Sequence, residues 1–295
     1  MKAIKIVLAA AALLFTACGK DGADMRLRLF SENMAAAGGA KVLVDPATPS
    51  GASWVAGESI NLNGTAYPVA YDEGFYLNTG SDDIPSSLLA VYPSDTAAGD
   101  NDVTVTNDGA TGTVTIRNLC VDYREGGHRI LFPMAAANSL SERRLLFKHL
   151  TAGMRLTLTD TSTTKDYLVG SVRIVTYGES ATAAALPAVN GVSCRWAVQG
   201  PSVPGGEIGG TEGDVSMAYS SEMHFTLRDN GVAGKAIPKN GSISLCVPVT
   251  VNRIKTIVVT GYDTDGRQLF SRTKTLGTEL GVEVNTIYTI PEIQF

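Results

Sequence analysis

Residues 103–118 read VTVTNDGATGTVTIRN. Valine or isoleucine alternates with threonine on both arms of this stretch, and this is the period of a strand with one buried face. The central Asn-Asp-Gly belongs to the residue types that form tight turns between antiparallel strands. The stretch therefore predicts a β-hairpin.

Similar strand and turn patterns occur on both sides of this stretch. Hairpins are predicted for 65–79 and 254–276, and further strands for 26–30 and 88–93. A long strand is expected over 145–159 with a break near 151–153, and a terminal strand over 286–295. No amphipathic helix of three or more turns stands out, so the predicted fold class is all-β.

One stretch leaves an alternative open. Ser139 and Glu142 have the spacing of a capping box, which favours the start of a helix just before 145–159. The strict alternation at the end of 145–159 favours a strand instead. We expect a short turn or helical turn followed by the long strand.

The N-terminus has the pattern of a secretory signal. Lys2 and Lys5 precede an apolar run at 6–15, which is too short to cross a bilayer. Residues 15–18 (FTAC) resemble the bacterial lipobox, which implies lipidation of Cys18 after a cut that removes 1–17. An ordinary signal peptide that happens to contain a cysteine is the alternative. Residues 18–25 are then a polar tether, similar to signals that export Bacteroidales lipoproteins to the cell surface.

Composition limits the function of the mature chain. Cleavage before Cys18 would leave 278 residues, enough for two domains or one large β-sandwich. Loss of two lysines leaves 22 basic against 29 acidic side chains, a net charge of −7. No basic stripe is available to neutralise phosphates, so nucleic acid is not an expected partner.

No catalytic or metal-binding constellation emerges. The sequence has no nucleophile elbow, zinc-protease helix motif or phosphate loop. We therefore expect neither an enzyme nor a cofactor or metal. The histidines and the remaining cysteines are dispersed in strand-like runs or between them, so satisfied structural histidines and buried thiols are expected, with one disulfide as the alternative. They are His128, His149, His224, Cys120, Cys194 and Cys246.

Several stretches, taken in order, resemble the fimbrillin family, the lipoprotein pilins of Bacteroidales. They share with that family a Trp followed by Gly-Glu and Ile, an Ala-x-Tyr-Pro strand end, a Pro-x-Met-Ala, a Phe-x-His-Leu-x-Ala strand and a closing Gly…Tyr-x-Ile strand. These stretches are 53–60, 90–94, 132–136, 146–154 and 281–290.

The resemblance implies two tandem β-sandwich domains of transthyretin-like type, at 26–147 and 148–295. It also implies a pilus subunit or accessory component at the outer membrane surface. Such subunits assemble with one another by β-strand exchange and contribute to adhesion. Strand 26–30 would be removed by a protease, leaving a groove that a neighbouring subunit fills, with 288–295 as a candidate donor.

The maturation site is left open. Lys41 stands where the family's cleavage arginine is expected, and Arg28 lies within the first strand. Cleavage at either residue would release a processed subunit, whereas retention of the N-terminus would leave a lipid-anchored one. Asp95-Thr96-Ala97 resembles the O-glycosylation signal of Bacteroidales secreted proteins, with Thr96 as the acceptor.

A second function fits part of the sequence. Four aromatic residues cluster around the 65–79 hairpin, where exposed rings could stack on sugars: Tyr67, Tyr71, Phe75 and Tyr76. Core packing of the same rings is the alternative. The competing hypothesis is thus a non-polymerising surface lipoprotein that binds glycan or a host protein.

Overall fold

The computed structural model describes residues 26–31, 35–36, 58–72, 74–79, 87–94, 103–109, 111–116, 119–125, 127–139, 144–162, 164–179, 192–197, 220–249, 253–283 and 286–295. These residues contain strands and connecting loops and no helix, so the fold is all-β, as predicted. The strands are β1 (Arg26–Ser31), β2 (Ala35–Ala36), β3 (Ser59–Leu62), β4 (Thr65–Tyr71), β5 (Phe75–Asn78), β6 (Ser87–Tyr92), β7 (Val103–Asn107), β8 (Thr111–Ile116), β9 (Leu119–Arg124), β10 (Gly127–Arg129), β11 (Met134–Ser139), β12 (Arg144–His149), β13 (Ala152–Thr159), β14 (Tyr167–Val169), β15 (Ser171–Tyr177), β16 (Val192–Ala197), β17 (Ser220–Asp229), β18 (Val232–Ala233), β19 (Lys235–Ile237), β20 (Ser242–Val249), β21 (Arg253–Tyr262), β22 (Gln268–Gly281), β23 (Thr286–Thr289) and β24 (Ile293–Gln294).

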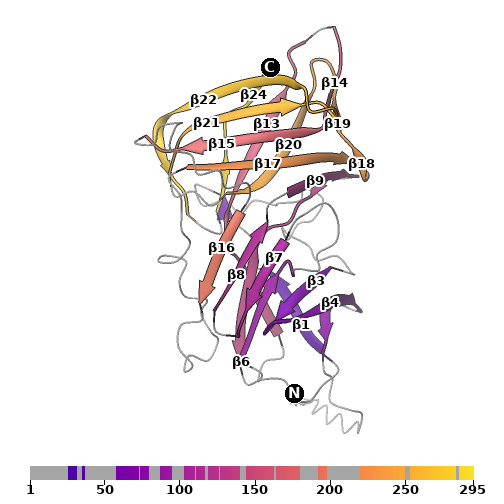
Figure 1. Ribbon diagram of the computed structural model, residues 1–295, viewed down its shortest axis with the longest axis vertical. Helices are drawn as coiled ribbons and strands as arrows, with labels where there is room; N and C mark the ends of the chain where they lie inside the picture. The colour runs from indigo at the N-terminus through magenta and orange to yellow at the C-terminus, as the bar shows by residue number, and fades with distance from the viewer. Residues whose placement is uncertain are drawn as a thin grey trace, which may run out of the picture.

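A closed barrel occupies the lower part of the molecule (Figure 1). Its described strands follow the order β1-β12-β11-β6-β3-β4-β5, and β5 pairs with β1 to complete the circle. Alternate side chains of these strands point inward and form one apolar core. That core comprises Leu27, Leu29, Ile60, Leu62, Val69, Leu77, Ala90, Tyr92, Met134, Ala136, Leu145 and Phe147.

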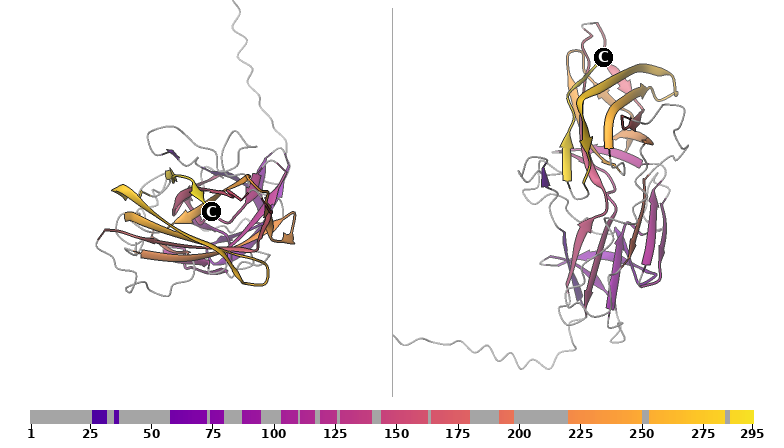
Figure 2. Two further views of the ribbon diagram at one scale, coloured as in Figure 1. Left: turned by 90° about the horizontal axis from the view of Figure 1, so that it is seen from above. Right: turned by 90° about the vertical axis from the view of Figure 1, so that its left-hand side faces the viewer.

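A β-sandwich forms the upper part (Figures 1 and 2). One sheet has the order β10-β9-β17-β15-β21-β22, with β18 paired to β17. The other has the order β2-β23-β13-β20, with β24 paired to β13. Phe225 and Ile257 from the first sheet share a core with Leu156 and Leu245 from the second. The hydroxyl of Tyr123 on β9 donates to the carbonyl of Ser244 on β20, which also ties the two sheets together.

Two segments cross the predicted division at 147/148. Strand β9 pairs in parallel with β17, so 119–124 belong to a sheet built mostly from the second half of the chain. Conversely, β16 pairs with β8 and joins the β7/β8 hairpin in a three-stranded sheet. Strands β12 and β13 lie in the barrel and the sandwich respectively, on either side of Leu150 and Thr151. The domain limits themselves stay a prediction.

The hairpins predicted from alternation are confirmed. Strands β7 and β8 pair in antiparallel register with Val105 opposite Val114, and β4 pairs with β5. Strands β21 and β22 form the third hairpin, with β22 continuing to Gly281. The interrupted strand is confirmed as β12 and β13, but the break lies at 150–151, because residues 152 and 153 already belong to β13. Ser139 ends strand β11 rather than starting a helix, while Glu142 lies outside the described residues.

Several predictions fall outside the described residues. They concern the signal segment, the tether, Cys18, Lys41 and Thr96. The side chain of Cys194 also falls outside. Within the described ranges, no helix is long and apolar enough to cross a membrane.

Candidate functional site: the first strand and its groove

Strand β1 lies between two strands of opposite direction. It pairs antiparallel with β5, where Leu27 lies opposite Leu77, and parallel with β12, where Phe30 lies opposite Leu146. No other described strand joins β5 to β12. Removal of β1 would therefore turn the closed barrel into an open sheet with two unpaired edges.

The inner face of β1 is anchored by two leucines. Leu27 is 1% exposed and Leu29 is 5% exposed, and both belong to the barrel core. Burial of a leucine side chain stabilises the fold by roughly 1.5–3 kcal/mol. The two leucines thus hold β1 in place, and without it their sites would be apolar pockets spaced two residues apart.

The outer face of β1 is held by Arg26. Its Nη1 lies 2.8 Å from Oδ2 of Asp72, and its guanidinium carbon lies 4.8 Å from the ring centroid of Tyr76. The Arg26 side chain is 41% exposed and that of Asp72 is 55% exposed. Exposed ion pairs contribute only about 0.2–1 kcal/mol to stability. The contacts of Arg26 therefore stabilise the position of β1 less than the burial of the two leucines does.

Arg28, one of the two predicted maturation residues, lies in the middle of β1. Its backbone is paired with Tyr76 on one side and with Arg144 on the other. A protease needs an extended segment that is free to enter its cleft, and a strand paired on both edges does not offer one. Cleavage at Arg28 would therefore require β1 to leave the barrel first.

The predicted donor segment is built into the chain's own sandwich. Strands β23 and β24 pair in parallel with β13, and Ile287, Tyr288, Ile290 and Ile293 are buried. The ring of Phe295 stacks on Phe270, with centroids 3.9 Å apart and an interplanar angle of 13°. To act as a donor, this segment would have to leave its own sheet.

The three histidines differ in their surroundings. His128 Nε2 accepts the backbone N–H of Cys246, and His224 Nε2 lies 3.2 Å from Glu222. His149 is 1% exposed and neither of its ring nitrogens has a hydrogen-bond partner, so the expectation of a satisfied histidine is wrong there. Burial lowers the pKa of His149 to about 4.

The cysteines show no disulfide among the described side chains. Cys246 is a buried thiol, and burial raises its pKa to about 12. Cys120 is a half-buried thiol on β9. The expectation of buried thiols is confirmed for Cys246, while the state of Cys194 remains a prediction. No group of three or more candidate metal ligands occurs in the residues that the structure covers.

The aromatic residues of the β4/β5 hairpin divide between core and surface. Tyr67 and Phe75 pack partly against the barrel core. Tyr71 is 64% exposed, and its ring meets that of Phe75 edge-on with centroids 4.9 Å apart. Core packing therefore accounts for two of the rings, while Tyr71 offers an open aromatic face.

Sequence reasoning missed an ion-pair cluster on the outer face of the seven-stranded sheet. Nε and Nη2 of Arg173 donate to the two carboxylate oxygens of Glu222 at 2.7 and 2.6 Å, and Arg173 lies opposite His224 in the strand register. The Arg173 hydrogen bonds lower the pKa of Glu222. The alternation Glu222-Met223-His224 signals a common face for the two polar residues, but the pairing with β15 is not visible in the sequence.

No known family model matches this chain, and no curated protein matches it in sequence. Three solved structures resemble it, all candidate cell adhesion proteins of Bacteroides. The one from Bacteroides ovatus is 11% identical with a TM-score of 0.41, over 92% of this chain and 92% of that chain. The one from Bacteroides fragilis is 14% identical with a TM-score of 0.37, over 90% and 91%. The one from Bacteroides uniformis is 11% identical with a TM-score of 0.31, over 93% and 94%. These similarities are too distant to transfer a fold or a function.

Proposed function

We propose that this chain is a surface pilus subunit or accessory component that assembles by exchange of β1 and contributes to adhesion. It reaches the outer membrane through a lipid on Cys18, and its partners are other pilus subunits. The observation that carries the proposal is the position of β1, which alone among the described strands closes the barrel between β5 and β12. A vacated groove there would offer two strand edges and the two leucine pockets to an incoming strand.

The groove defines what an incoming strand must look like. It needs apolar side chains at two alternate positions, matching Leu27 and Leu29, with polar residues between them. A donor from a second copy must also be free to leave its own subunit. The buried side chains of β23 and β24 make their release costly, so we propose that a donor segment is freed only as assembly proceeds.

Two maturation routes are compatible with this proposal. In one, a protease cuts C-terminal to β1, for example at Lys41, and β1 leaves with the lipid. In the other, the N-terminus is retained and the chain serves as an anchor whose barrel stays closed. Arg28 is the less suitable cleavage residue because it is paired on both sides.

Mass spectrometry of the N-terminus of surface-extracted protein tests the proposal. Monomer and detergent-resistant multimer are separated without boiling and analysed individually. A multimer that begins after residue 31, beside a monomer that begins at acylated Cys18, is the expected result. Multimers in which every chain still begins before residue 26 would refute strand exchange through a vacated β1 groove.

A second candidate function is binding of a neutral glycan at the exposed ring of Tyr71. The observation that favours it is the 64% exposure of that ring beside Phe75. Glycan binding that is lost in Tyr71→Ala but retained in Tyr67→Phe would support it. Finally, we propose that the chain is not an enzyme. Arg173 lowers the pKa of Glu222 beside His224, whereas a carboxyl acting as a general acid needs a raised pKa.

A further inference from the structure

The outer face of β1 carries an arginine that the β4/β5 hairpin binds. Arg26 directly precedes Leu27, so its side chain lies on the opposite face from the core that Leu27 and Leu29 enter. Its guanidinium contacts the carboxylate of Asp72 and the ring of Tyr76. Asp72 comes directly after β4, and Tyr76 lies on β5. Both residues would therefore stay in the barrel if β1 left it.

The two contacts together form a site for a cation. The Nη1 of Arg26 lies 2.8 Å from Oδ2 of Asp72, a distance typical of a hydrogen bond between charged groups. The guanidinium carbon lies 4.8 Å from the ring centroid of Tyr76, inside the limit of about 6 Å for a cation–π contact. A neutral or negative side chain in the same place would make neither the ion pair nor the cation–π contact.

Departure of β1 would empty this cation site along with the two leucine pockets. The Asp72 carboxylate would lose its guanidinium partner, and the ring of Tyr76 would lose the cation that lies over it. A strand that enters in the direction of β1 can restore both contacts only with a lysine or arginine at the position of Arg26. That position directly precedes the first apolar residue, so the required order is cation, apolar, any residue, apolar.

The chain's own C-terminal segment does not meet this requirement. Residues 288–295 contain no lysine or arginine, and their one charged side chain is that of Glu292. Glu292 directly precedes Ile293 and Phe295, just as the arginine of β1 precedes the two leucines. In that register the segment would bring a second carboxylate to Asp72, and like charges on neighbouring strands repel each other.

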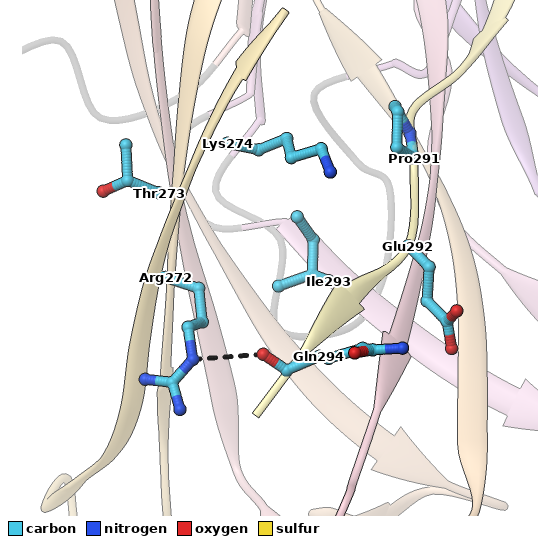
Figure 3. Close-up of a pocket in the computed structure, with 7 residues that line it drawn as sticks. All are labelled: Arg272, Thr273, Lys274, Pro291, Glu292, Ile293 and Gln294. Carbon is cyan, nitrogen blue, oxygen red and sulfur yellow. Dashed lines mark hydrogen bonds between the residues drawn. The ribbon is translucent and has the colours of Figure 1, made fainter.

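The C-terminal segment is also held in its own sandwich. Figure 3 shows Arg272 of β22 donating from Nε to the carbonyl of Gln294, at 3.1 Å. The carboxylate of Glu292 accepts a hydrogen bond from the hydroxyl of Thr159 on β13. The polar groups of this segment thus suit the place that it already occupies better than they suit the β1 groove.

We propose that the vacated β1 groove selects a strand of another pilus subunit that carries a lysine or arginine directly before two alternate apolar residues. Asp72 and Tyr76 bind the cation, and the two leucine pockets take the apolar side chains. This selection rests on the proposed exchange of β1 and adds the chemistry of the partner strand. Within a single subunit the same contacts hold β1 in place, a role that needs no partner.

Breaking the ion pair from either side separates the two roles. Arg26→Gln removes a charge that leaves with β1, whereas Asp72→Asn removes the charge that stays in the groove. We expect Asp72→Asn to lower the amount of detergent-resistant surface multimer roughly two- to fivefold, and Arg26→Gln to leave it at or above the native level. Asp72→Glu keeps the charge and should retain the multimers. Asp265→Asn, in an exposed turn of the sandwich, is the control for loss of a carboxylate elsewhere.

Three results would overturn the proposal. Multimers at or above the native level in Asp72→Asn would mean that the carboxylate does not bind the incoming strand. An equal loss in Arg26→Gln would mean that the ion pair acts only within one subunit, and an equal loss in Asp265→Asn would mean that the effect is not specific to the groove. Native protein without multimers that begin after residue 31 would instead refute the exchange of β1 itself, and this selection with it.

Discussion

Leu27 of β1 lies directly opposite Leu77 of β5, and both side chains are buried in the barrel core, at 1% and 0% exposure. This pair closes the barrel at the seam where β1 meets β5. The strand that resembles a removable segment in the sequence is therefore also the strand that completes a hydrophobic core. Its loss would cost the barrel both edge pairing and apolar contact.

Truncation of the β1 leucines should weaken the barrel. Leu27→Ala leaves a cavity opposite Leu77, and such changes in buried sites cost about 2–5 kcal/mol. Leu146→Ala on neighbouring β12 is the matched control, because Leu146 is 41% exposed. Urea unfolding should show the large loss for Leu27→Ala and a change within roughly 0.5 kcal/mol for the control. Equal effects would mean that β1 does not contribute to the core as described.

Gly261 should not tolerate a side chain. A Cβ at this position would lie 2.2 Å from Cε1 of Phe270, the residue directly opposite on β22. Gly261→Ala should therefore push Phe270 out of its place and destabilise the sandwich by about 1–3 kcal/mol. Gly277→Ala is the control, because a Cβ there has open space around it. Thermal unfolding should separate the two variants, and an unchanged midpoint for Gly261→Ala would contradict the packing.

The buried His149 should make stability depend on pH. Its pKa falls from 6.5 to about 4 on folding, so the unfolded chain binds the proton more tightly. Above about pH 6.5, the titration of His149 therefore does not change the free energy of unfolding. As the pH falls toward 4, it lowers the free energy of unfolding progressively, by up to about 3 kcal/mol.

The variant His149→Leu isolates this effect. Stability measured by urea unfolding from pH 7 to 4 should fall less steeply in His149→Leu than in the native chain. His224→Gln, which changes a half-exposed histidine, should leave the steep fall in place. A native slope that His149→Leu does not alter would mean that His149 finds a partner for its proton.

The stack of Phe295 on Phe270 should stabilise the separate subunit. Aromatic pairs contribute about 0.5–1.5 kcal/mol beyond their buried area. Phe295→Ala should lower the unfolding free energy of the monomer by at least that amount, and Gln294→Ala, one residue away and exposed, by much less. Retained stability in Phe295→Ala would favour a C-terminal segment that is readily donated.

Local sequence patterns correctly predicted the local hairpins. The Val/Thr alternation around Asn107 to Gly109 predicted β7 and β8 because an antiparallel hairpin needs only neighbouring residues. The pairings of β1 with β12 and of β9 with β17 join distant, parallel strands, for which no turn signal exists. The lack of a hydrogen-bond partner for His149 also depends on contacts between residues that are far apart in the sequence. The same is true of the Arg173–Glu222 ion pair. The resemblance to fimbrillins drew attention to β1, but its place between β5 and β12 came from the structure.

A disulfide lock tests the central claim, that β1 leaves its groove when subunits assemble. Arg28 and Tyr76 lie opposite each other across β1 and β5, and the Cα separation of such antiparallel pairs suits a disulfide. Thr106 and Thr113 on β7 and β8, whose hydroxyls lie 2.8 Å apart, provide a matched control lock. We predict that Arg28→Cys/Tyr76→Cys abolishes surface multimers, that reduction restores them, and that the control lock has no effect. Multimers at the native level with the Arg28–Tyr76 lock closed would contradict the account.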